Sequence, residues 1–195
     1  CFDDVLLEPQ YSDIESRSKV DVSVSMGDFK FEHPIIPANM KSISGRDMVM
    51  ENCEHGGLSI LNRFISLNEQ LDIAQDMMYD NQKRFGISIG VKDTDKDVVA
   101  KFVDYGVQII CIDVAHGHSK QCIEMTEWIK NTYPKTLLIS GNVATKSGAM
   151  ALWEAGADIV KVGIGPGSLC STRVETGNGV PQLTALLDIQ EARLN

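Results

Sequence analysis

The sequence of 195 residues contains no apolar run long enough to span a bilayer, and it shows no signal-peptide pattern. We therefore expect a cytoplasmic protein that has no membrane partner. Acidic residues outnumber basic ones, which gives a formal net charge of -9 and disfavours nucleic acid as the main partner. A local phosphate pocket built from backbone N–H groups is compatible with this charge, so a phosphorylated metabolite is an acceptable ligand.

Paired cysteines and a metal-binding cluster are also lacking. The five cysteines are odd in number and include no C-x-x-C pair, which argues against a disulfide framework and against a zinc ribbon. His116 and His118 follow Asp113 in "DVAHGHS", but no carboxylate cluster completes a metal shell, so metal catalysis is disfavoured. We expect Asp113 to bind a polar edge of a ligand and the two histidines to satisfy loop carbonyls.

Six short apolar runs recur along the chain, and each predicts a β-strand. They are nearly continuous in apolar residues, as in parallel strands that are covered on both faces. The runs are residues 33–39, 56–62, 84–91, 107–115, 136–144 and 157–165. Amphipathic helical patterns lie between them and stop at glycine or proline, and Ser44 is expected to cap the first helix. This order predicts successive β/α units, arranged either as a barrel or as a doubly wound sheet.

Polar loops follow nearly every predicted strand, and this favours the barrel. The stretches "PANMKS", "LNRF", "DVAHGHS", "SGNVAT" and "GIGPGSLCSTR" all come after strands. A barrel builds its site from many strand ends, whereas a doubly wound sheet concentrates its site at one switch point. We predict an α/β fold with one catalytic domain over residues 1–195, about the first six units of a (β/α)8 TIM barrel. The chain begins at Cys1 without methionine and ends at "EARLN", so both ends are expected to be cut from a longer protein.

The loop "GIGPGSLCSTR", residues 163–173, combines permissive backbone with one cysteine. A dinucleotide fingerprint is disfavoured, because its third glycine would fall at Ser168 and Pro166 removes an N–H group. A phosphate loop in which Ser168 and neighbouring amides hold the phosphate is favoured, and a turn without ligand is the alternative. We expect backbone amides and Arg173 to lower the pKa of Cys170, which makes it a candidate nucleophile with Thr172 as a proton relay.

Two further expectations concern the remaining cysteines and the segment after the loop. Cys53, Cys111 and Cys122 are expected to be buried structural residues, the commoner state of this residue type. Residues 172–180, "TRVETGNGV", have no apolar period and predict a mobile flap next to Cys170, with an ordinary exposed loop as the alternative.

Five motifs together resemble the IMP dehydrogenase and GMP reductase family. They are "FDDVLLEPQYSDIESRSKVDVS", "DVAHGHS", "SGNVAT", "EAGADIVKVGIGPGSLCSTR" and "GVPQLTAL", in this order. The resemblance implies a (β/α)8 barrel, usually in a homotetramer, whose loop cysteine attacks C2 of a purine nucleotide. A nicotinamide cofactor then exchanges a hydride with that carbon.

The resemblance favours the reductase branch, which converts GMP to IMP and ammonia with NADPH. Residues 66–90 run through without the regulatory insertion common in IMP dehydrogenases, and "RVETGNG" and "PANM" resemble the reductase versions. The alternatives are an IMP dehydrogenase that lacks the insertion and oxidises IMP with NAD, a non-catalytic nucleotide-binding barrel, and a different phosphate-binding barrel enzyme.

The resemblance also implies roles for individual residues. It assigns catalysis to Cys170 and Thr172, and substrate contacts to Ser168, Met40 and Asn142. Cofactor contacts fall on Asp113, Val114, Ala115, Ile164, Gly165 and Arg63, and on Ser16 and Arg17 toward a neighbouring subunit. The carbonyls of Gly165, Gly167, Cys170 and Arg173 would hold a monovalent cation, K+. Asn62-Arg63 replaces the common His-Lys, Lys41 replaces a common Asp, and the family's last two strands, which carry further phosphate loops and an acidic or Arg-containing dyad partner, have no counterpart in this chain.

Overall fold

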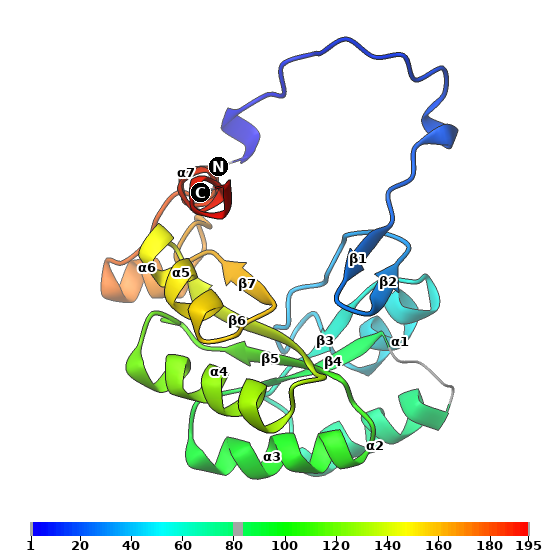
Figure 1. Ribbon diagram of the computed structural model, residues 1–195, viewed down its shortest axis with the longest axis vertical. Coiled ribbons are helices and arrows are strands. Elements are labelled where there is room, and N and C mark those ends of the chain that lie inside the picture. Colours follow the sequence, from blue (N-terminus) through cyan, green and yellow to red (C-terminus); the bar gives the residue numbers. More distant parts are fainter. Residues whose placement is uncertain (1, 80–83, 195) are drawn as a thin grey trace.

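Five parallel strands form one curved sheet in the computed structural model, which describes residues 2–79 and 84–194 (Figure 1). The strands are β3 (Ser59–Leu61), β4 (Phe85–Ile89), β5 (Ile109–Asp113), β6 (Leu137–Val143) and β7 (Ile159–Val162), and they neighbour one another in sequence order. Sequential parallel pairing with intervening helices is the arrangement of a (β/α)8 barrel. The predicted α/β fold is therefore confirmed, and the sheet is consistent with part of such a barrel.

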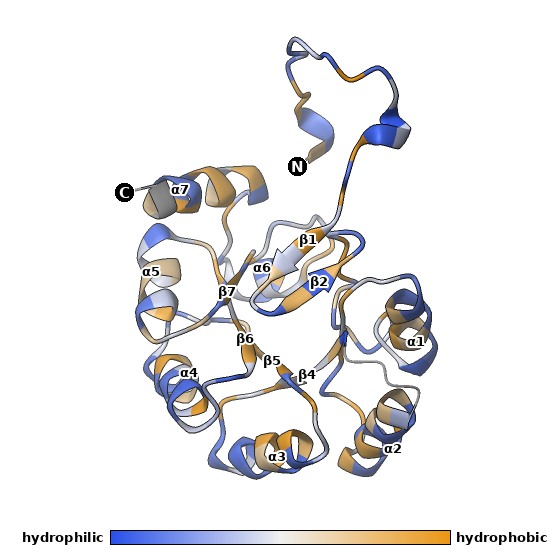
Figure 2. Cartoon of the chain, turned by 45° about the vertical axis from the view of Figure 1, so that its right-hand side comes forward, coloured by the Kyte–Doolittle hydropathy of each residue, from blue (hydrophilic) through white to orange (hydrophobic). Residues whose placement is uncertain are grey.

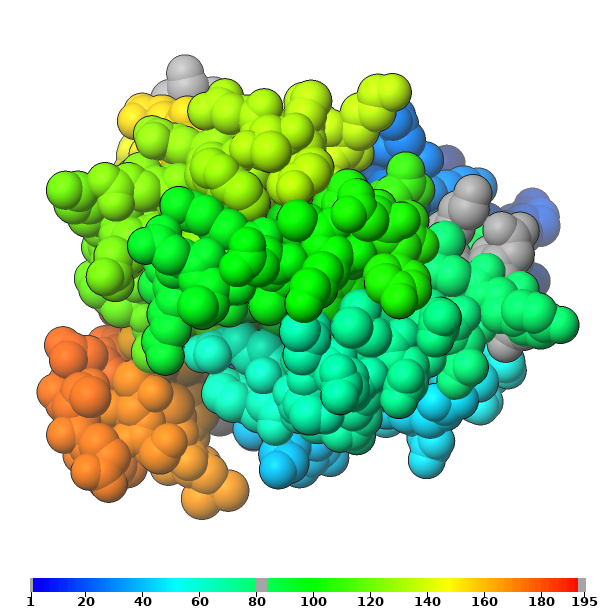
Figure 3. Space-filling model, turned by 90° about the horizontal axis from the view of Figure 1, so that it is seen from below, coloured from blue at the N-terminus to red at the C-terminus, as the bar shows by residue number. Residues whose placement is uncertain are grey.

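Helices cover the outer, convex face of the sheet (Figure 2). They are α1 (Arg46–Glu54), α2 (Leu67–Tyr79), α3 (Asp93–Asp104), α4 (Lys120–Thr132) and α5 (Lys146–Glu154). From below, α2, α3 and α4 form one continuous surface (Figure 3). Each helix buries an apolar stripe: Val99 and Phe102 of α3 join Ile110 and Ile112 of β5 in the larger core cluster. The helices thus provide the cover that the continuous apolar runs of the sequence predict.

The opposite face of the sheet forms a second, smaller core. Alternate residues of a strand point to opposite faces, so Ile109 and Cys111 of β5 face inward while their neighbours face the helices. The hairpin of β1 (Val24–Met26) and β2 (Phe29–Phe31) packs Phe31 into this inner cluster. Because Leu58 and Leu137, at the strand starts, belong to the same cluster, the hairpin covers the amino-terminal end of the sheet. The carboxyl ends of the strands are left for the site.

Two local predictions are wrong. Residues 33–39 do not form a strand, because Pro34 and Pro37 lack the N–H groups that a ladder needs. Ser44 does not cap α1: its hydroxyl is buried and donates to the carbonyl of Ile60 at 2.5 Å, and Gly45 occupies the N-cap. Ser44 instead ties its segment to β3, while Asn39 at the end of the other segment bonds to Lys161 of β7.

The first residues of the described chain form an exposed arm. It contains the short 3-10 helices η1 (Phe2–Asp4) and η2 (Arg17–Lys19) and arcs away from the strands and their helices (Figure 1). Leu6, Leu7 and Tyr11 are each more than nine-tenths exposed on this arm. Within the described residues, no helix is both long enough and apolar enough to cross a membrane.

Candidate functional site

Two adjoining cavities open at the carboxyl ends of the strands. The larger has a volume of about 1200 Å³ and lies over the inner face of the sheet, between residues 36–42 and β7. The smaller, of about 320 Å³, lies between the loop after β5 and the loop after β7. Phe64, Asp113 and Asn142 line both cavities. The predicted gathering of polar loops at one end of the sheet is therefore confirmed.

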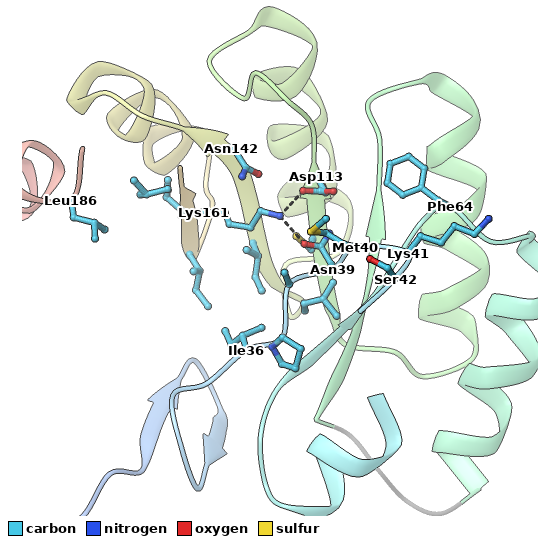
Figure 4. A pocket seen from close by; sticks show the side chains of 18 residues that line it. Ile36, Asn39, Met40, Lys41, Ser42, Phe64, Asp113, Asn142, Lys161 and Leu186 are labelled. Carbon is cyan, nitrogen blue, oxygen red and sulfur yellow. Dashed lines mark hydrogen bonds and ion pairs between the residues drawn. The ribbon is translucent and has the colours of Figure 1, made fainter. Parts of the chain in front are cut away.

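A hydrogen-bonded group of three polar side chains, Lys161, Asp113 and Asn39, lines the larger cavity (Figure 4). The ammonium Nζ of Lys161 lies 2.5 Å from Oδ1 of Asp113 and 2.8 Å from Oδ1 of Asn39. The side chains of Lys161 and Asp113 are 30% and 21% exposed, so water screens this ion pair less than it screens a surface pair. The contact joins β5, β7 and the segment that precedes α1.

Two buried polar atoms beside this group have no partner in the described part of the chain. They are Nδ2 of Asn39, which is a donor, and Oδ1 of Asn142, which is an acceptor. The amide of Asn142 is oriented by its other end, because Nδ2 donates to the carbonyl of Gly163 at 3.0 Å. An unpaired buried group costs about 1–3 kcal/mol, and both residues line the larger cavity.

Cys170 lies at the edge of the smaller cavity together with Thr172. The backbone N–H of Arg173 is the main cause that lowers the pKa of the Cys170 thiol, and hydrogen bonds from the backbone and hydroxyl of Thr172 act in the same direction. Burial raises the pKa of the thiol of Cys53 to about 11 and that of Cys111 to about 12. Cys170 is thus the described cysteine whose pKa is lowered, as predicted.

The other three described cysteines are buried, which confirms their predicted structural role. Cys122 contacts Ser140 at 3.6 Å, and its pKa is also raised by burial. A high pKa keeps these thiols protonated and unreactive. Among the described cysteines, Cys170 is the one that is not buried.

The Cys170 loop is held by the segment that follows it. After α6 (Ser171–Thr176), the chain returns toward β7: Nε2 of Gln182 donates to the carbonyl of Val162 and the N–H of Val180 to that of Ile164, each at 3.0 Å. Residues 172–176 of the segment predicted as a flap are helical. Its mobility stays a prediction.

The structure brings most of the predicted site residues to these cavities. The smaller cavity is lined by Arg63, Asp113, Val114, Ala115, Asn142, Ile164, Gly165, Cys170 and Thr172, and Met40 lines the larger one. Arg63 donates from Nε to the backbone carbonyl of Asp113 at 3.2 Å, and its guanidinium lies 4.6 Å from the centre of the Phe64 ring. The replacement of His-Lys by Asn62-Arg63 therefore leaves a cation at the cavity.

Other predicted residues lie elsewhere. Ser168 and Gly167 are exposed on the loop and line neither cavity, and Ser16 and Arg17 belong to the exposed arm. His116 and His118, whose ring centres are 6.4 Å apart, line a further cavity with Thr172. Within residues 2–79 and 84–194, no group of three or more His, Cys, Asp or Glu side chains is placed to hold a metal ion.

Sequence reasoning missed Lys161 and Asn39. One signal was present for the lysine: it interrupts the apolar run of residues 157–165, with Val160 and Val162 on either side. A charged residue inside a buried strand needs a partner. Asn39 belongs to the polar stretch "PANMKS", but its pairing with Lys161 arises only in the tertiary fold.

A family model and individual relatives with similar sequences point to the same protein family. The family model described as IMP dehydrogenase / GMP reductase domain matches residues 1–195. A protein named GMP reductase from Streptococcus agalactiae is 41% identical over 187 residues, which are 95% of this chain and 57% of that relative. GMP reductases from Lactobacillus johnsonii and Vibrio parahaemolyticus are 39% and 36% identical over 95% and 98% of this chain. The chain spans 57% of the length of each of these relatives.

Proposed function

The chain belongs to the IMP dehydrogenase / GMP reductase family, and we propose that the full-length protein is a GMP reductase that uses NADPH to convert GMP to IMP and ammonia. The observation that carries this proposal is Cys170, an accessible thiol whose pKa is lowered by backbone and Thr172 hydrogen bonds at the edge of a cavity. A lowered pKa increases the fraction of thiolate, the nucleophilic form that the proposed covalent step needs.

The reaction proceeds through a bond between the Cys170 sulfur and C2 of the purine. The thiolate attacks C2, the bond from C2 to the exocyclic nitrogen breaks, and ammonia leaves after it gains a proton. Thr172, which hydrogen-bonds the Cys170 thiol, would relay that proton. NADPH, when bound, supplies a hydride to C2. The C2–S bond then breaks, which releases IMP and restores the thiolate. Two easier steps thereby replace one difficult substitution.

The smaller cavity fits the reacting end of a nicotinamide cofactor. Val114, Ala115, Ile164 and Gly165 line this cavity, and Arg63 and the Asp113 carboxylate add charge to its wall. Met40 and Asn142, which line the larger cavity, would contact the purine nucleotide there. Ser168 would bind the phosphate. We propose that Ser16 and Arg17 on the exposed arm reach the cofactor of a neighbouring subunit in a cytoplasmic homotetramer.

A monovalent cation such as K+ is part of the proposal. Its ligands would be the carbonyls of Gly165, Gly167, Cys170 and Arg173. The carbonyls of Gly167, Cys170 and Arg173 each accept one backbone N–H, from Cys170, Val174 and Gly177. A carbonyl oxygen has two lone pairs, so each keeps one for a cation. Bound there, the ion would hold the ends of the Cys170 loop together.

The test is an assay of the full-length protein in two cuvettes, one with GMP and NADPH and the other with IMP and NAD. We expect loss of reduced-nicotinamide absorbance in the first and no gain in the second. Gain in the second alone would show an IMP dehydrogenase that lacks the regulatory insertion. No change in either would favour a non-catalytic nucleotide-binding barrel.

A variant separates covalent catalysis from binding. Cys170→Ala should abolish turnover while GMP still binds, as measured by calorimetry, because the thiol makes the bond to C2 and the cavity residues make the other contacts. Retained turnover in Cys170→Ala would contradict the covalent mechanism and would favour a different barrel enzyme that uses a base at another strand end.

A further inference from the structure

We infer that Lys161 is a positioning residue, which reaches across Gly141 to fix the carboxylate of Asp113 for binding of the nicotinamide cofactor. This inference rests on the proposed function, because it concerns the reductant of that reaction. It adds a residue to which neither the motifs nor the family resemblance assigned a role.

The register of the sheet places the three residues in one row. Asp113 of β5 pairs with Gly141 of β6, and Gly141 pairs with Lys161 of β7. Paired residues on neighbouring strands point to the same face, and this row lies on the inner face, beyond Cys111 in β5 and Ile139 in β6. A cation and an anion therefore flank a position that has no side chain.

The glycine in the middle is required by space. A Cβ atom built on Gly141 would lie 2.6 Å from the carbonyl oxygen of Lys161 and 2.7 Å from its Cβ. The Lys161 side chain crosses this row to reach Asp113, so any larger residue at position 141 would occupy its path. Figure 4 shows the ammonium group between Asp113 and Asn39. The ion pair between Lys161 and Asp113 thus depends on the glycine between them.

The contacts of Lys161 fix the direction of the Asp113 carboxylate. Nζ donates to Oδ1 of Asp113 at 2.5 Å and to Oδ1 of Asn39 at 2.8 Å, so the ammonium is anchored from a second side. Arg63 bonds the backbone carbonyl of Asp113 through Nε. Lysine at position 161 therefore supplies the ion-pair partner of the carboxylate.

Asp113 is the residue for which such fixing matters most. It lies at the junction of the two cavities and lines both of them. A carboxylate that is held by one oxygen keeps a defined direction for its second oxygen, which can accept a hydroxyl group of a ligand. Fixing that direction in advance lowers the conformational cost of binding. We expect this to strengthen binding of the cofactor, because its proposed contacts include Asp113.

The test uses the full-length protein with Lys161→Met, which keeps the aliphatic stem and removes the charge. We expect its KM for NADPH to rise about tenfold, because a charge-assisted hydrogen bond is lost, while kcat changes by less than about threefold. Lys161→Arg should restore most of the NADPH affinity, since it keeps a donor and a positive charge. The control is Lys130→Met, because Lys130 forms a similarly half-buried pair with Asp158 at 2.7 Å, near the start of β6.

Two readouts do not depend on turnover. Calorimetry should show weaker binding of NADP+ by Lys161→Met than by wild type and Lys130→Met. A crystal structure of Lys161→Met should show that Asp113 has left its position, whereas a merely structural role would leave the carboxylate in place. In a double-mutant cycle, Lys161→Met combined with Asp113→Asn should weaken NADP+ binding no more than Asp113→Asn alone.

The outcomes separate this inference from the proposed function. An active wild-type enzyme with an unchanged KM for NADPH in Lys161→Met overturns the positioning role and leaves the GMP reductase assignment intact. Equal losses in Lys161→Met and Lys130→Met also overturn it, because general destabilisation would then explain both. A wild-type protein that oxidises no NADPH with GMP contradicts the proposed function, and this inference with it.

Discussion

Gly165 and Gly179 lie backbone against backbone. A Cβ atom built on Gly179 would be 3.1 Å from the carbonyl oxygen of Gly165 and 3.2 Å from its Cα. Gly165 adopts a φ of 62°, in the left-handed region, and a Cβ there would be 2.6 Å from the carbonyl oxygen of Asn178. Two glycines therefore allow the returning segment to pack directly on the Cys170 loop, which explains the permissive backbone next to a reactive thiol.

Gly165→Ala should lower the thermal midpoint of the full-length protein by about 3–6 °C. The left-handed φ costs alanine about 1–2 kcal/mol, and the backbone of Asn178 blocks the new methyl group. Gly167→Ala is the matched control for stability, because nothing lies within 4 Å of a Cβ at that position. Differential scanning fluorimetry measures both, and equal midpoints would contradict the close packing.

Iodoacetamide should alkylate Cys170 faster than the other described cysteines. The thiolate is the reactive form, so the rate rises with pH and levels off above the pKa. Since hydrogen bonds lower the pKa of Cys170, its inflection should lie below that of an ordinary thiol. Burial raises the pKa of Cys53, Cys111 and Cys122 and shifts their reaction to higher pH. Peptide mass mapping assigns each product, and preferential alkylation of Cys111 would refute this order.

Thr172→Val should move the inflection of Cys170 alkylation to higher pH. The Thr172 hydroxyl is one of the groups that lower the pKa of the Cys170 thiol, and valine removes the donor while it keeps the shape. Thr172→Ser keeps the hydroxyl and should retain the wild-type profile. The same pH series of alkylation rates measures both variants, and identical inflections would show that the backbone amides alone stabilise the thiolate.

Asp158→Ala should destabilise the protein without weakening NADPH binding. Oδ2 of Asp158 accepts hydrogen bonds from Nζ of Lys130 and from the backbone N–H of Leu138, each at 2.7 Å. Removing the carboxylate leaves the N–H of Leu138 unpaired and takes one of two acceptors from Lys130, whose Nζ also donates to the carbonyl of Thr136 at 2.9 Å. The expected loss is about 1–3 kcal/mol. We expect a lower thermal midpoint and an unchanged KM for NADPH. A changed KM would show that the start of β6 influences the site.

The sequence predicted the fold well because its signals are local. The strands β5 and β6 read as continuous apolar runs, and their helices end where glycine or proline stops the pattern. The prediction of a strand over residues 33–39 was wrong because it followed the isoleucines. Pro34 and Pro37 have no N–H groups to form the hydrogen bonds of a strand. Ser44 misled in the same way, since its burial against Ile60 depends on a contact between distant segments.

The part of the candidate site that could be predicted from the sequence lies within one loop. Cys170, Thr172 and the glycines before them occupy a single stretch, so composition alone marked it. The row of Asp113, Gly141 and Lys161 spans three strands, and only the register shows that a glycine separates the charges. Asn39 joins that row through Lys161, which lies 122 residues further along the chain. Pairings of this kind need the tertiary structure.

The hydrogen bonds from Val180 and Gln182 also bear on strand pairing. Unpaired main-chain carbonyls along a strand can accept the N–H groups of a strand from another molecule. The carbonyls of Val162 and Ile164 already accept a side-chain amide and a main-chain N–H from the returning segment. The segment that packs on the reactive loop thereby also withholds these two acceptors from pairing between molecules.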